Sequence, residues 1–124
     1  MERLIIEATD ETPNVNLSED DAYLSFSGKS LPEDVRSFYN PILEWIDNYI
    51  GQARKKTTVE FKMDYFNTAS SKIILDILLK VVDLRETGQE LAVKWMYKTN
   101  DLDMKEAGEE YSEIAEIEFE FIPY

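Results

Sequence analysis

The chain has 124 residues, which suffices for one compact domain with a single core but not for two. It contains no cysteine and no histidine, so disulfides, thiolate nucleophiles, cysteine or histidine zinc sites and Ser-His-Asp triads are excluded. The formal net charge of −13 disfavours nucleic acid and anionic membrane surfaces as partners. The acids could steer a protein partner with a basic face toward the chain, but the favoured interpretation is a solvated surface that serves solubility.

The N-terminal region predicts two strands, at residues 4–6 and 22–27. The second alternates apolar and polar side chains, which is typical of a half-buried strand. The polar residues 8–21 between them include the turn formers Pro13 and Asn14 and are expected to form a long loop. We therefore expect the two strands to form an antiparallel pair.

A helix is predicted next, because residues 30–33 have the Ser-x-x-Glu spacing of a capping box. A broad apolar stripe then recurs over residues 35–50 at steps of three and four. Pro41 interrupts the stripe, which indicates either a kink or the start of a second segment. Gly51 and the cations at 54–56 suit a helix C-terminus.

The remaining residues continue the alternation of strands and helices. The expected elements are a strand at 57–64, a helix marked by apolar residues at 73–82 and ended by Gly88, a strand at 91–97, a helix at 101–112 and a strand at 117–121. This order predicts an α/β fold, a single domain over residues 1–124 with a mainly parallel, mixed sheet. Because Glu60 and Lys62 alternate with apolar residues, one sheet face stays wet, which favours two layers with all helices on one face.

The junction at residues 64–72 gathers hydroxyls between a strand and a helix. A helix N-terminus has free backbone N–H groups and a partial positive charge, so a phosphate on Thr68 would be tolerated there. We expect Thr68 both to cap the helix and to accept a phosphoryl group. The structural alternative is that Asn67 or Thr68 is only an N-cap and that Ser70 and Ser71 are ordinary first-turn residues.

Three neighbours complete the expected partner-binding face. Lys72 lies one turn beyond Thr68 and could neutralise a phosphate or guide a kinase, or could simply be solvated. Tyr65 and Phe66 end the strand and could be interface anchors or core residues. The expected face therefore consists of Tyr65, Phe66, Asn67, Ser70, Ser71 and Lys72 around Thr68.

Catalytic and cofactor sites receive little support. Asp101 and Asp103 lack the glycine and the distal glutamate of a calcium loop, so we interpret them as a loop and a helix N-cap. Asp64 and Asp76 have no accompanying nucleophile. The four glycines form neither a dinucleotide fingerprint nor a P-loop. No metal, cofactor or enzymatic activity is expected.

No apolar run is long enough to cross a bilayer, and the start lacks a signal-peptide layout, so a cytoplasmic location is expected.

Segments along nearly the whole chain resemble a known family. They are Ile6-Glu7-Ala8-Thr9 with Thr12-Pro13, the helix run at 38–45, the segment at 61–79 centred on the junction, and Asp103-Met104 followed by Glu106-Ala107-Gly108. The chain is similar to the SiaC-type biofilm-regulation phosphoproteins, which are related in fold to the STAS-domain anti-sigma-factor antagonists. The resemblance implies a STAS-like domain without catalytic activity.

The resemblance also implies reversible phosphorylation of Thr68 by a protein kinase and a metal-dependent Ser/Thr phosphatase. The unphosphorylated form would bind and activate a diguanylate cyclase, raising cyclic di-GMP and favouring biofilm, and phosphorylation would break that complex. STAS antagonists often have an Asp-Ser-Ser-Gly-like junction, which this chain lacks, and a match to them alone leaves Ser70 or Ser71 as rival acceptors. The alternatives are a constitutive assembly subunit and an anti-sigma-factor-antagonist-like partner-switching protein.

Overall fold

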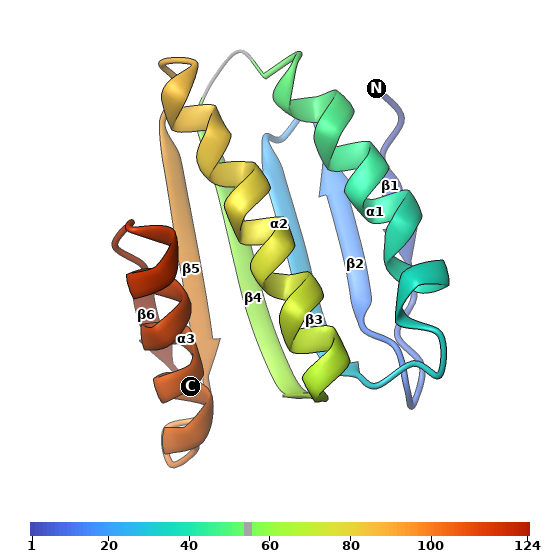
Figure 1. Cartoon of the computed structure of the whole chain (residues 1–124), viewed down its shortest axis with the longest axis vertical. Helices are drawn as coiled ribbons and strands as arrows, with labels where there is room; N and C mark the ends of the chain where they lie inside the picture. Colours follow the sequence, from blue (N-terminus) through green and yellow to red (C-terminus); the bar gives the residue numbers. More distant parts are fainter. Residues whose placement is uncertain (54–55) are drawn as a thin grey trace.

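The computed structural model describes residues 1–53 and 56–124, and its elements follow one another across a single six-stranded sheet in chain order (Figure 1). The strands are β1 (Leu4–Ile6), β2 (Asn14–Ser18), β3 (Tyr23–Ser30), β4 (Thr57–Phe66), β5 (Leu91–Tyr97) and β6 (Glu120–Pro123). The helices are α1 (Val35–Ile50), α2 (Thr68–Glu86) and α3 (Leu102–Ala115). Within the described part of the chain, no helix combines the length and apolar character needed to span a membrane.

The sheet is mixed. The pairs β1–β2 and β2–β3 are antiparallel, whereas β3, β4, β5 and β6 are parallel to one another. Each parallel crossover contains one helix, and the three helices lie on one face of the sheet (Figure 1). Crossovers of one hand that always step the same way across a sheet leave their helices on the same side. The predicted two-layer α/β fold is confirmed.

The N-terminal prediction was wrong in one respect, because residues 8–21 are not all loop. Strand β2 lies between β1 and β3, so those two strands pair with β2 and not with each other. Val15 and Leu17 are fully buried on the helix side, and they alternate with Asn14 and Asn16 on the other face. Only two apolar residues reveal this strand, and the polar surroundings hid the alternation.

Helix α1 begins later than the capping-box spacing indicated. Asp34 is its N-cap, and its carboxylate accepts a hydrogen bond from the Ser37 N–H (3.1 Å). Ser30 instead ends β3 and is fully buried. Pro41 lies inside the one helix, so no second segment starts there. Of the cations expected at its C-terminus, those at 54–55 lie outside the described residues.

The last helix is longer and the last strand shorter than expected. Helix α3 runs to Ala115, and Glu116 takes a left-handed conformation (φ 58°) that turns the chain. The Ile117 N–H then donates to the Ser112 carbonyl, while the Ser112 hydroxyl donates to the Ile117 carbonyl. These two bonds hold Ile117 against the last turn of the helix, so β6 starts only at Glu120.

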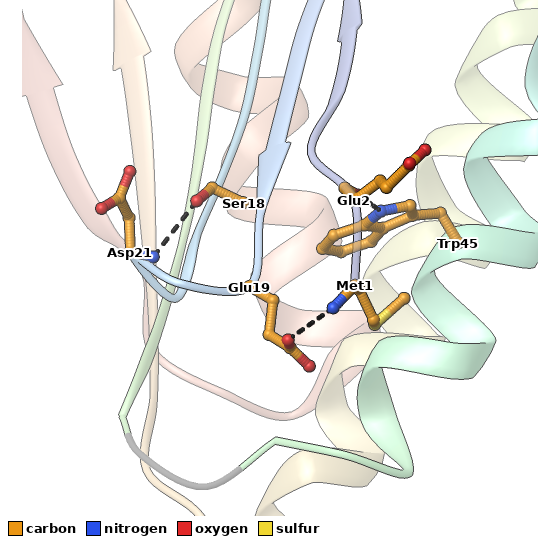
Figure 2. Close-up of polar contacts among 6 residues, drawn as sticks. All are labelled: Met1, Glu2, Ser18, Glu19, Asp21 and Trp45. Carbon is orange, nitrogen blue, oxygen red and sulfur yellow. Dashed lines mark hydrogen bonds and ion pairs between the residues drawn. The ribbon is translucent and has the colours of Figure 1, made fainter.

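The N-terminal strand is tied to α1 and to the β2–β3 turn (Figure 2). The Trp45 indole N–H donates to the Glu2 carbonyl (2.9 Å), and the Met1 amino group lies 2.8 Å from the Glu19 carboxylate. The Asp21 N–H in turn donates to the Ser18 hydroxyl (3.1 Å). The first two bonds hold the residues that lead into the short edge strand β1, and the third lies within the turn that Met1 reaches.

Trp95 of β5 is the centre of an aromatic cluster beneath α3. Its ring centroid lies 5.5 Å from those of Phe61 and Tyr111, and its indole N–H donates to the Met104 carbonyl (2.9 Å). Helix α3 can come this close because residue 108 is glycine: a Cβ there would lie 2.4 Å from Trp95 Cδ1. The glycine thus sets the distance between α3 and the sheet.

We predict that Gly108→Ala destabilises the fold by about 1–3 kcal/mol, because the new methyl group overpacks the indole. Urea unfolding followed by tryptophan fluorescence measures the loss. Gly51→Ala is the matched control: that residue is right-handed (φ −69°) and has room for a methyl group, so its stability is expected to be equal or higher. Equal stability of Gly108→Ala and the unmodified chain would contradict the close approach of α3.

Candidate functional site

The candidate site lies where β4 ends and α2 begins. Asn67 is the N-cap of α2: its side-chain oxygen accepts a hydrogen bond from the Ser70 N–H (2.8 Å), and its own N–H donates to the Ser30 carbonyl (3.0 Å). Thr68 is the first helical residue. The expectation that Thr68 also caps the helix was therefore wrong, because the amide of Asn67 already takes that role.

The three hydroxyls of the first turn have different surroundings. Ser70 is fully buried and accepts a hydrogen bond from the Ser30 hydroxyl (2.8 Å). Ser71 is half-buried, and its hydroxyl donates to the Thr68 carbonyl (2.7 Å). Thr68 is exposed, and its hydroxyl has no hydrogen-bond partner among the described residues. Only the hydroxyl of Thr68 is thus both open to solvent and uncommitted.

The buried hydroxyl of Ser70 is part of a chain of hydrogen-bonded hydroxyls that joins three elements. The Ser30 hydroxyl at the end of β3 lies 2.7 Å from the hydroxyl of Tyr39 in α1. Since Ser30 donates its one proton to Ser70, Tyr39 is the donor to Ser30. Burial raises the pKa of Tyr39 and so keeps it protonated as that donor. This chain joins the first turn of α2 to β3 and α1.

Helix α3 holds the same turn from the other side. The Tyr111 hydroxyl donates to the Ser71 carbonyl (2.8 Å). Burial raises the pKa of Tyr111 to about 12, against the smaller opposing effect of that hydrogen bond. The phenol is therefore neutral and available as a donor at physiological pH.

The residues expected to form the partner-binding face separate into exposed and buried groups. Tyr65 is exposed (52%), as is Lys72, whereas Asn67 and Ser71 are half-buried. Phe66 packs against the core, with its ring centroid 6.4 Å from that of Trp95 and 6.3 Å from that of Tyr111. The prediction that Ser70 belongs to the partner-binding face was wrong, because this residue is fully buried.

The backbone at the start of α2 can receive an anion. As the first residues of the helix, Thr68 and Ala69 have N–H groups without intrahelical partners, and no hydrogen bond to them occurs in the described part of the chain. These donors and the helix dipole favour negative charge at this end. Both residues are exposed, so an anion can approach from solvent.

The acidic candidates take structural roles. Asp101 caps α3 by accepting from the Met104 N–H (3.1 Å), which confirms the prediction of an N-cap. Asp64 lies 3.7 Å from the Lys98 ammonium group. Sequence reasoning missed Tyr39 and Tyr111 as supports of the junction. Their helical spacing marked them as apolar-face residues, and no sequence signal showed where their hydroxyls point.

The family assignment follows from a match over most of the chain. Residues 6–124 match the model of the SiaC family, described as regulatory phosphoproteins. The chain belongs to the SiaC family. It is also 24% identical over 119 residues to an uncharacterised protein of Pseudomonas aeruginosa strain UCBPP-PA14, with 96% of this chain and 94% of that protein covered.

Solved structures of SiaC share the fold. Apo-SiaC from Pseudomonas aeruginosa superposes with a TM-score of 0.91 at 24% identity, covering 98% of this chain and 99% of that one. A structure of the diguanylate cyclase SiaD in complex with its activator SiaC, from the same organism, gives a TM-score of 0.91 at 23% identity, with the same two coverages. At this level of identity the likeness establishes the fold.

We predict that Asn67→Ala lowers the free energy of unfolding by about 1 kcal/mol, because it removes the acceptor for the Ser70 N–H. Asn67→Asp retains a capping oxygen and is expected to stay near the unmodified stability. Chemical denaturation of the three proteins measures the difference. Equal stability of Asn67→Ala and the unmodified chain would contradict the assignment of the cap.

A second prediction concerns high pH. The pKa of Tyr111 is about 12 in the folded chain and about 10 when unfolded, so its contribution to stability is present below pH 10 and is lost as the pH rises toward 12. We expect the free energy of unfolding to fall less steeply over that window in Tyr111→Phe than in the exposed-ring control Tyr65→Phe. Denaturation at several pH values measures both slopes. Equal slopes would contradict the raised pKa of the buried Tyr111 phenol.

Proposed function

We propose that the chain is a signalling adaptor without catalytic activity, switched by phosphorylation of Thr68. The unmodified form binds and activates a protein partner, and the phosphorylated form releases it. One observation supports Thr68 as the acceptor: it has the exposed, uncommitted hydroxyl of the first turn, whereas Ser70 is buried and Ser71 is bonded to a helix carbonyl. A kinase can reach Thr68 without opening the fold.

The electrostatics of the helix end fit a phosphate that leaves the fold intact. A phosphothreonine adds about 1.5 to 2 negative charges at neutral pH. At the start of α2 this charge meets the free N–H groups of Thr68 and Ala69, and a helix N-terminus stabilises an anion by about 0.3–1 kcal/mol. Lys72, one turn further on, is exposed and can approach the phosphate. Modification is therefore expected to leave the domain folded.

The same negative charge would weaken the binding of a protein partner. The exposed ring of Tyr65 lies three residues before Thr68, at the end of β4, and is suited to anchor an interface. A dianion next to such an apolar contact must be desolvated when the partner docks, which costs several kcal/mol unless a cation pairs with it. The switch acts on association because the modified atom is on the surface.

For the partner we propose a diguanylate cyclase, so that the switch controls cyclic di-GMP and biofilm formation. The support is membership of the SiaC family together with the solved complex in which SiaC is named as the activator of the cyclase SiaD. The enzymes that act on Thr68 would be a protein kinase and a metal-dependent Ser/Thr phosphatase. A cyclase activator needs no active site of its own, which agrees with the absence of histidine and cysteine.

The test combines the purified chain, its cognate kinase and its cyclase. Intact mass is expected to show one added phosphate on the unmodified sequence and on Ser71→Ala, and none on Thr68→Val, which keeps the side-chain shape. Phosphorylation is expected to weaken cyclase binding at least a hundredfold, equivalent to about 3 kcal/mol, with no loss of thermal stability.

Two outcomes would contradict the proposal. Labelling of Thr68→Val to the same extent as the unmodified chain would move the acceptor elsewhere. Equal cyclase affinity before and after phosphorylation would indicate a constitutive assembly subunit.

A further inference from the structure

Tyr111 of α3 contacts the junction on both sides of Thr68. Its ring packs against Phe66, two residues before Thr68, with 6.3 Å between the ring centroids. Its hydroxyl donates a hydrogen bond to the carbonyl of Ser71, three residues after Thr68 (2.8 Å). One side chain from a neighbouring helix therefore holds the last residue of β4 and the first turn of α2 at the same time.

Ser71 extends this contact to Thr68 itself. The Ser71 hydroxyl donates to the Thr68 carbonyl (2.7 Å), and the Ser71 N–H donates to the Asn67 carbonyl (2.9 Å). Ser71 is thus bonded to α3 through its carbonyl, and to Asn67 and Thr68 through its two donors. The result is a relay of two hydrogen bonds, one from Tyr111 to Ser71 and one from Ser71 to Thr68.

The relay holds the side of the turn that the buried hydroxyls do not reach. Helix ends fray more readily than helix centres, because the groups of the terminal turns lack intrahelical partners. The bond between Ser30 and Ser70 holds the turn against β3, on the core side. Tyr111 supplies the hydrogen bond from the side of α3, which lies on the same face of the sheet as α2 (Figure 1). Removing that bond would free the Ser71 peptide group, and with it the peptide group of Thr68.

We propose that Tyr111 is a positioning residue for the phosphorylation of Thr68. Its hydroxyl bonds to Ser71 and not to the acceptor, so it acts by fixing the backbone from which the Thr68 hydroxyl projects. The inference rests on the proposed function, because it presupposes a kinase that acts on Thr68.

The chemistry of the transfer explains why orientation matters. Thr68 Oγ1 forms a bond to the terminal phosphorus of a nucleoside triphosphate held by the kinase. The bond from that phosphorus to the nucleoside diphosphate breaks, and the hydroxyl proton passes to a base of the kinase. The attacking and leaving oxygens must lie roughly in line, so a misplaced acceptor reacts more slowly even when the kinase is bound.

Tyr49 provides a matched control for Tyr111. It is a buried tyrosine whose hydroxyl lies 2.6 Å from Thr57 Oγ1, at the start of β4. The junction follows the other end of this ten-residue strand, about 30 Å away at 3.3 Å per residue. Tyr49→Phe and Tyr111→Phe each keep the ring and remove one hydrogen-bonded hydroxyl, so we expect similar losses of global stability from the two.

The first test measures the steady-state kinetics of Thr68 labelling, with the full chain and its cognate kinase. For Tyr111→Phe we expect kcat to fall at least fivefold while KM stays within twofold, and for Tyr49→Phe we expect both to stay within twofold. A purely structural loss would instead raise KM, because it only lowers the fraction of substrate that is folded.

Ser71→Ala tests the second bond of the relay. This variant is expected to accept its full phosphate, but with a kcat lowered in the same direction as that of Tyr111→Phe. Because the two bonds act in series, the double variant is expected to be little slower than the slower single variant. Independent, multiplying effects would contradict the relay.

The second test needs no kinase. Hydrogen exchange of the backbone amides at 71–75 is expected to be at least fivefold faster in Tyr111→Phe than in Tyr49→Phe, whereas the amides in the middle of β4 exchange alike in both. Equal exchange at 71–75 would overturn the relay.

The two tests separate this inference from the proposed function. Equal kcat for the two tyrosine variants, or faster labelling of Tyr111→Phe, would overturn the positioning role. Faster exchange in Tyr111→Phe together with a phosphate found on a residue other than Thr68 would overturn the proposed acceptor, and with it the positioning role, while the contact from α3 to the turn would stand.

Discussion

The chain of hydroxyls from Tyr39 through Ser30 to Ser70 is the interaction on which the candidate site depends. It places the first turn of α2 against the end of β3 and the inner face of α1, in a region closed to solvent. Buried polar groups are costly when unpaired, so each member of this chain needs the others. Together with the Asn67 cap, it fixes the start of α2 without any contribution from the Thr68 side chain.

Within one helical turn, the hydroxyls that hold the turn in place are different from the hydroxyl that faces solvent. Ser70 faces the core because it is two residues beyond Thr68, which places it about 200° around the helix. The same geometry leaves Thr68 beside solvent and brings Ser71 under Tyr111 of α3. A modified Thr68 therefore changes the charge of a surface, while the hydroxyls that maintain the turn remain paired. That division is what the proposed switch requires, namely a local modification that changes association and leaves the domain folded.

Much of the fold could be predicted from periodicity, because β3, β4 and β5 each alternate clearly and α1 has a broad apolar stripe. Strand β2 was missed because its signal is confined to Val15 and Leu17. In the site, the position of the helix start was predictable, but the separate roles of Asn67, Thr68 and Ser70 were not. Capping residues resemble one another in sequence, and burial of a serine depends on a tyrosine brought close only by the fold.

Proton–nitrogen correlation spectra of the unmodified and the phosphorylated chain show whether charge at Thr68 alters the surface and leaves the interior as it was. We expect large shifts for the amides of Thr68 and Ala69, smaller ones for exposed neighbours such as Lys72, and unchanged signals for the indole N–H of Trp95. Shifts that spread through the core, or loss of the dispersed spectrum, would contradict it.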